Sequence, residues 1–145
     1  MTQDLKVYAL SIGTFGISMS NIDIILKINL MENLATLAQL VVSVSVIIVW
    51  VFRYDNIVVE FKQYGISDLL RNIVGASKIS LATILLLAIC YEGLPLVEAS
   101  LGMAFFMICA QIAHIKVKNP LIKYVPSFIF LVLSLFIAAF NYGVI

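Results

Sequence analysis

Charged side chains are scarce in this sequence. Only 12% of its 145 residues are Asp, Glu, Lys or Arg, whereas 63% are hydrophobic, and the mean hydropathy is +1.11. A soluble domain is about a quarter charged and about half apolar. The net charge of +1 provides no basic surface for a nucleic acid. The composition therefore predicts an integral membrane protein and excludes a nucleic-acid-binding one.

Reactive side chains are scarce as well. The chain has one histidine, His114, and two cysteines, Cys90 and Cys109, which form no C-x-x-C motif. A lone histidine without cysteine or carboxylate partners cannot complete a metal site, and the missing dithiol argues against a thiol oxidoreductase. We interpret both cysteines as small apolar packing residues. The sequence thus offers no catalytic residue and no metal site, which leans against an enzyme.

Long apolar runs are what the sequence has in abundance. A helix needs about 20 mostly apolar residues to cross the hydrocarbon core of a bilayer. Four segments have this character: 34–52, 72–91, 96–115 and 124–142. Because every backbone polar group must be satisfied inside lipid, such runs form helices. We predict an all-α membrane protein with a bundle of four transmembrane helices.

The N-terminal region, residues 1–30, is less regular. Residues 6–26 are apolar but interrupted by serine, threonine and glycine, and Asp23 lies near one end. This stretch predicts an additional N-terminal helix that either spans the membrane or lies on its surface. Met31 begins a second piece, as an internal translation start or a fusion point. We therefore divide the chain into an N-terminal helical extension, 1–30, and a membrane domain, 31–145.

A short amphipathic helix is expected after the first apolar run. Apolar residues recur there at helical spacing, with charged and polar residues between them, which is typical of a helix lying in the membrane interface. Gly65 ends this helix, and Ser67 or Asp68 caps the next one. The apolar positions are Ile57, Val58, Phe61 and Tyr64.

Lysine and arginine gather in two connections, 53–71 and 114–123, whereas the turn at Glu92 contains neither. With four spanning helices, both basic connections lie on one side of the membrane. Basic loops favour the cytoplasmic side. We therefore predict that both connections are cytoplasmic and that the C-terminus at Ile145 is extracytoplasmic.

Lys78 is a charged residue inside an apolar run. It lies seven residues after Arg71, which is about 10 Å along a helix, and a charge at such a depth costs at least ~2.5 kcal/mol unless it is paired or reaches water. Three interpretations remain open. The ammonium pairs with Glu60 or Asp55, it binds an anion or a quinone carbonyl, or its stem extends to the interface.

Gln111 and His114 are three residues apart and share a helix face. His114 is either an interfacial residue bonded to a neighbour or a residue that handles protons or contacts a quinone. We predict one polar cluster at the cytoplasmic mouth of the bundle, which is a candidate ligand-binding site. It consists of Glu60, Lys78, Gln111 and His114, and the ion-pair candidates beside it are Asp55, Arg53 and Arg71.

Four short motifs follow one another within residues 34–143. They are an aromatic-to-glycine segment from Phe61 to Gly65, a glycine-to-lysine helix start from Val74 to Lys78, a turn with Pro95, and a helix end from Ala110 to His114. Together they resemble the DoxX-like family of small four-helix membrane proteins. The resemblance does not cover residues 1–30. It implies a four-helix bundle in a bacterial inner membrane.

The resemblance implies two directions for function, because some relatives are quinone-linked oxidoreductase subunits and others assist in assembly. Since reactive groups are scarce, we expect an accessory or assembly subunit of a membrane complex without catalysis of its own. The alternative is a subunit of a quinone-linked oxidoreductase that binds a lipophilic carrier near Lys78 and His114. Small-solute transport is a weaker alternative, because no span is broken at mid-membrane. Apart from a quinone or a lipid, no cofactor is expected; the partners are the bilayer and another protein or a second copy of the chain.

Overall fold

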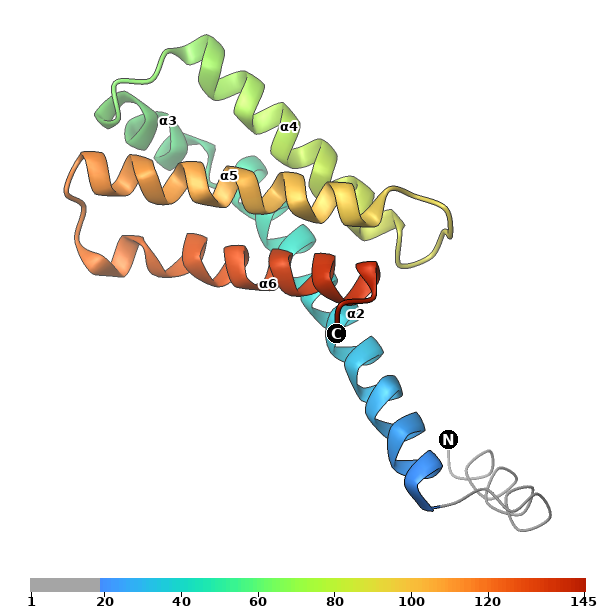
Figure 1. The fold of residues 1–145 in the computed structure, drawn as a ribbon. Coiled ribbons are helices and arrows are strands. Elements are labelled where there is room, and N and C mark those ends of the chain that lie inside the picture. Colours follow the sequence, from blue (N-terminus) through green and yellow to red (C-terminus); the bar gives the residue numbers. More distant parts are fainter. Residues whose placement is uncertain (1–18) are drawn as a thin grey trace. The chain divides into compact units, whose positions relative to one another are not determined.

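The computed structural model describes residues 19–145, with side chains from residue 21 onward. This part of the chain is helical and contains no strand (Figure 1). Four of its helical segments are long and apolar enough to cross a bilayer, so the predicted all-α membrane fold is confirmed. The elements in order are α2 (Met19–Phe52), α3 (Tyr54–Gln63), α4 (Asp68–Leu87), α5 (Leu96–Lys116), the 3-10 turn η1 (Leu121–Lys123) and α6 (Val125–Tyr142).

The chain divides into two compact units, residues 1–33 and 34–145. Helix α2, described as Met19–Phe52, contains the first predicted span, and Met31 lies within it. Part of the predicted N-terminal helix, residues 6–18, falls outside the described residues, and the remainder of it belongs to α2. All packing discussed below belongs to the unit 34–145.

The sequence ends α3 and starts α4 with two local signals. Gly65 adopts a positive φ of 71°, and the Ile66 N–H donates to the Phe61 carbonyl at 3.0 Å, which is the hydrogen bond of a glycine C-cap. The Ser67 hydroxyl then accepts from the Leu70 N–H at 3.4 Å as the N-cap of α4. The predicted ends of both helices are confirmed.

Small side chains let the helices approach closely. A Cβ atom added at Gly75 of α4 would lie 2.5 Å from the Trp50 ring of α2, so only glycine fits this contact. One buried hydrogen bond joins the same two helices, from Gln39 Nε2 to the Leu85 carbonyl at 2.6 Å. Small residues that are also buried in the bundle include Ser43, Ala82, Ala99, Ser100, Ser134 and Ala138.

Large apolar side chains cover the outside of the bundle, as expected where lipid is the solvent. Ile112 and Phe128 are each 59% exposed. Both basic connections lie at the same end of the bundle: α3 is close to the α5–α6 connection, and the α4–α5 turn is at the opposite end (Figure 1). This end is called the basic end below.

Candidate ligand-binding cleft

A cleft of about 860 Å³ opens at the basic end of the bundle. Its walls come from α2, α3, α4, α5 and the start of α6, and they are mainly apolar and aromatic. Three of the four residues of the predicted polar cluster line it, namely Glu60, Lys78 and His114. Apolar residues of the walls include Val46, Trp50, Phe61, Val74, Phe105, Phe106, Met107, Ala110 and Phe130.

Lys78 is half-buried in the cleft wall, and its Nζ lies 5.9 Å from the centre of the Trp50 ring. A cation at this distance from an indole face is attracted by the ring. Gly75 and Lys78 are three residues apart on one face of α4. The glycine therefore lets Trp50 approach α4, and the lysine then lies over its ring.

Of the three interpretations of Lys78, the ion pair with Glu60 or Asp55 is not formed among the described residues. Glu60 instead lies 3.6 Å from Lys123 Nζ, because the α5–α6 connection brings this lysine to the side of α3. Among the described residues, no carboxylate comes within ion-pair distance of Lys78. The cleft wall thus contains an ammonium whose counter-ion is not supplied by its neighbours.

His114 is buried near the end of α5, and two polar side chains meet its Nδ1 atom. Asn119 Nδ2 lies 2.9 Å from it and the Tyr64 hydroxyl 3.0 Å from it. The Asn119 Oδ1 atom accepts from Gln63 Nε2 at 3.4 Å, which orients the Asn119 amide so that its NH₂ group donates to Nδ1. Nδ1 is then the acceptor, and Nε2 carries the imidazole proton.

The Nε2–H group of His114 is therefore a hydrogen-bond donor. No described residue accepts a hydrogen bond from it, and His114 lines the cleft. Together with Lys78, this histidine gives the cleft wall two donors that lack protein acceptors.

The end of α5 explains how Asn119 reaches His114. Lys118 adopts a positive φ of 52°, and the Asn119 N–H donates to the His114 carbonyl at 3.1 Å. This backbone pattern terminates a helix by folding the chain back over its last turn. It places the Asn119 side chain beside the imidazole that it orients.

Tyr64 supplies the second contact to the histidine and stands outside the spanning segments. Burial raises the pKa of Tyr64 to about 12, and the nearby Glu60 carboxylate adds to this rise. The phenol therefore keeps its proton at neutral pH. The ring also continues a row of aromatic contacts, in which neighbouring ring centres lie 5.5 to 6.1 Å apart, through Trp50, Phe61, Tyr64, His114 and Tyr124.

Gln111 has a supporting position behind the cleft. Its Nε2 donates to the Tyr124 carbonyl at 3.0 Å and to the Ser127 hydroxyl at 2.9 Å. It therefore joins α5 to the start of α6, while Ser127 lines the cleft. Of the four predicted cluster residues, three lie at the cleft and Gln111 braces its wall.

The three ion-pair candidates behave differently from one another. Arg71 pairs with Asp68 one turn earlier in α4 and stacks over the Tyr54 ring at 5.5 Å. Arg53 lines the cleft. Neither Arg53 nor Asp55 forms an ion pair with another described residue.

Sequence analysis did not assign three residues, Trp50, Tyr64 and Asn119, to the site. Trp50 has the position of an interfacial aromatic in the sequence, and its contact with Lys78 depends on how two helices cross. Tyr64 was one of the apolar positions of the amphipathic helix, and its hydroxyl has no signature of its own. Asn119 precedes a proline, which suggests only a turn.

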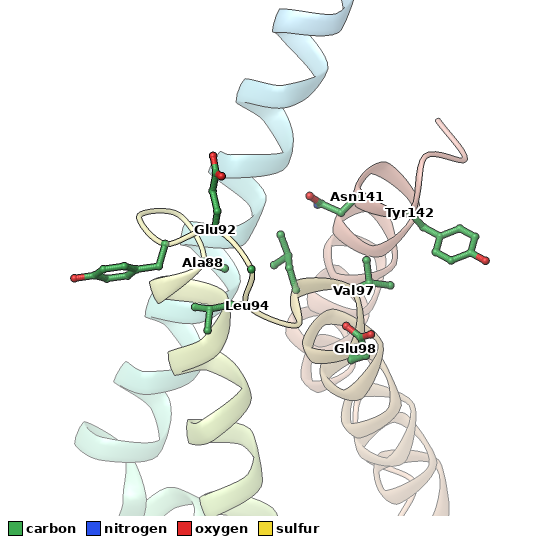
Figure 2. Close-up of a pocket in the computed structure, with 10 residues that line it drawn as sticks. Ala88, Glu92, Leu94, Val97, Glu98, Asn141 and Tyr142 are labelled. Carbon is green, nitrogen blue, oxygen red and sulfur yellow. The ribbon is translucent and has the colours of Figure 1, made fainter.

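A smaller hollow of about 440 Å³ lies at the opposite end, around the α4–α5 turn (Figure 2). Glu92 comes from the turn, Glu98 from the first turn of α5, and Asn141 and Tyr142 from the end of α6. The Asn141 amide donates to the Ile137 carbonyl of its own helix at 2.8 Å. Within residues 21–145, no basic side chain lines this hollow. Glu98 is favourable at the start of a helix for electrostatic reasons alone.

Metal and disulfide chemistry have no basis in the described residues. No three histidine, cysteine or carboxylate side chains there lie close enough together to hold a metal ion. Cys90 and Cys109 are free thiols. Both are exposed, and Cys109 lines the cleft. Their interpretation as small apolar packing residues stays a prediction.

Comparison with known proteins gives a single finding. A family model described as the DoxX-like family matches residues 33–137, which include the cleft walls from α2 to α6. No curated protein and no solved structure matches the chain.

Proposed function

Because the chain belongs to the DoxX-like family, and is a small integral membrane protein, we propose that it is an accessory subunit that holds a lipophilic carrier in its cleft. It has no catalysis of its own in this proposal. Ligand pockets typically enclose about 300 to 1,000 Å³ and combine apolar walls with a few polar groups. The cleft has this size and composition.

One observation carries the proposal. Lys78 and His114 both line the same apolar cleft, and no described residue accepts a hydrogen bond from the Lys78 ammonium or from the Nε2–H of His114. An amphiphilic molecule would place its tail against the aromatic walls and its polar head against these donors.

The second candidate is a subunit of a quinone-linked oxidoreductase in which the carrier is a quinone. The contact between the Tyr64 hydroxyl and His114 Nδ1, at 3.0 Å, favours it. A hydrogen-bonded phenol and imidazole beside a quinone carbonyl are suited to moving the protons that accompany quinone reduction. In both candidates the basic end faces the cytoplasm of a bacterial inner membrane.

Native mass spectrometry of the protein purified from its own membrane in mild detergent tests the binding proposal. Ala110 lines the cleft and Ala76 is exposed elsewhere, so Ala110→Phe fills the cleft and Ala76→Phe is its matched control. The wild type and Ala76→Phe are expected to carry a lipophilic molecule that Ala110→Phe lacks.

The same preparations distinguish the two candidates. A stoichiometric protein partner together with a redox-inactive lipid supports the accessory role, and a bound quinone supports the redox role. An equal amount of bound lipophile in both variants would place it on the outer surface and contradict the cleft.

A further inference from the structure

The charges around the cleft are unbalanced. Among the described residues, three basic side chains, Arg53, Lys78 and Lys123, line it, and one carboxylate, Glu60, does so. That carboxylate already lies beside one of the cations, Lys123, at 3.6 Å. The cleft therefore has an excess of positive charge. Lys78 lies ten residues inside the spanning segment Asp68–Leu87, whereas Lys123 is near the start of the segment Leu121–Tyr142 and Arg53 follows the end of α2.

We propose that the carrier in the cleft is a long-chain carboxylate whose head pairs with Lys78; this rests on the proposed function. An ammonium without a counter-ion in a spanning helix is costly, and an anionic head removes that cost. A neutral alcohol head would leave the charge unpaired. Charge-assisted hydrogen bonds are also stronger than neutral ones.

The second donor and the apolar walls fit the same ligand. Cys109 and His114 both belong to α5 and both line the cleft. His114 lies five residues closer to the C-terminal end of the helix, which is about 7.5 Å along the helix axis. A carboxylate oxygen in the cleft can accept from the Nε2–H of His114, from which no described residue accepts a hydrogen bond. Phe105 and Phe106 line the cleft further from that end of α5, in the position that an acyl chain requires.

The cleft also contains an intrinsic fluorescent probe of ligand binding, a tryptophan side chain. Trp50 is the only tryptophan of the chain, it lines the cleft, and Lys78 lies over its ring. Bromine atoms on a fatty chain quench tryptophan emission at short range. Quenching of the purified protein in non-ionic detergent therefore reports occupancy of the cleft directly.

The experiment compares a brominated fatty acid with the brominated fatty alcohol of the same chain length, at a pH where the acid is ionised. The wild type is expected to bind the carboxylate at least about tenfold more tightly than the alcohol. Lys78→Met should lose this preference, and Lys78→Arg should keep it. Lys62→Met removes an exposed lysine of α3 that does not line the cleft, and it should behave as the wild type.

Each other result has a defined meaning. Equal quenching by the acid and the alcohol in the wild type, or a preference that survives in Lys78→Met, overturns the carboxylate inference and leaves the proposed function standing. Absence of quenching by both probes contradicts the proposed function itself. Far-UV circular dichroism of every variant confirms that the helices are intact.

Discussion

The contact between Gly75 and Trp50 holds the cleft wall in place, and Gly75→Ala tests it. The new Cβ atom would lie 2.5 Å from Trp50 Cζ3 and 2.7 Å from Cε3. Carbon atoms in contact prefer about 3.5 to 4.0 Å, so the ring or the helix must move by roughly 1 Å. Forcing an extra methyl group into such packing costs about 1–3 kcal/mol.

Gly102→Ala in α5 is the matched control. Its Cβ atom would meet only the Leu81 methyl groups, at 3.2 Å, and a flexible side-chain end can yield. Both replacements gain the same helix propensity, about 1 kcal/mol, so the difference between the two variants isolates the clash. We expect Gly75→Ala to be less stable than Gly102→Ala by about 1–3 kcal/mol.

The assay is unfolding in mixed micelles with increasing fractions of a denaturing detergent, followed by far-UV circular dichroism. Trp50 emission is recorded in parallel, and only Gly75→Ala is expected to shift it. Equal unfolding midpoints for the two variants, with unchanged emission in both, would refute the close packing of α2 against α4.

Three further predictions follow from the cleft, the α5 terminus and the topology. In a Cys90→Ser background, a lipophilic maleimide should modify Cys109, which lines the cleft. A saturating cleft ligand should slow this reaction. A labelling rate that the ligand does not change would contradict the position of Cys109 in the cleft. Lys118→Gly should stabilise the protein by about 1 kcal/mol in a thermal melt, because glycine adopts a positive φ without strain, whereas a loss of stability would argue against that backbone conformation. In a cysteine-free chain, cysteines placed at positions 62 and 118 should both react with a membrane-impermeant maleimide from the cytoplasmic side only, and reaction from opposite sides would refute the topology.

Much of the fold follows from local signals that a sequence contains. The apolar runs give the spanning helices because lipid provides no hydrogen bonds to the backbone. Gly65 and Ser67 define the helix ends by conformational preference and capping, and both act within a few residues of the chain. The continuation of α2 through Met31 was not predicted, because a polar Glu-Asn pair is tolerated on an exposed helix face.

The sequence indicated which residues belong to the candidate site, but it did not indicate which contacts they form. Lys78 and His114 stood out because ionisable groups are rare in spanning helices. The partner of Glu60 depends on the position of Lys123, and the orientation of the imidazole depends on Asn119. Both contacts depend on tertiary structure, because the α5–α6 connection must fold against α3. A local sequence pattern does not indicate this contact.

The most direct test of the central claim is nitrogen NMR of the histidine ring, which is simple because His114 is the only histidine. The account predicts a neutral ring with the proton on Nε2 at neutral pH, and an Nε2 resonance that moves when a cleft ligand is added. The account would be contradicted by a proton on Nδ1, or by an Nε2 resonance that stays unchanged when a ligand is shown to bind.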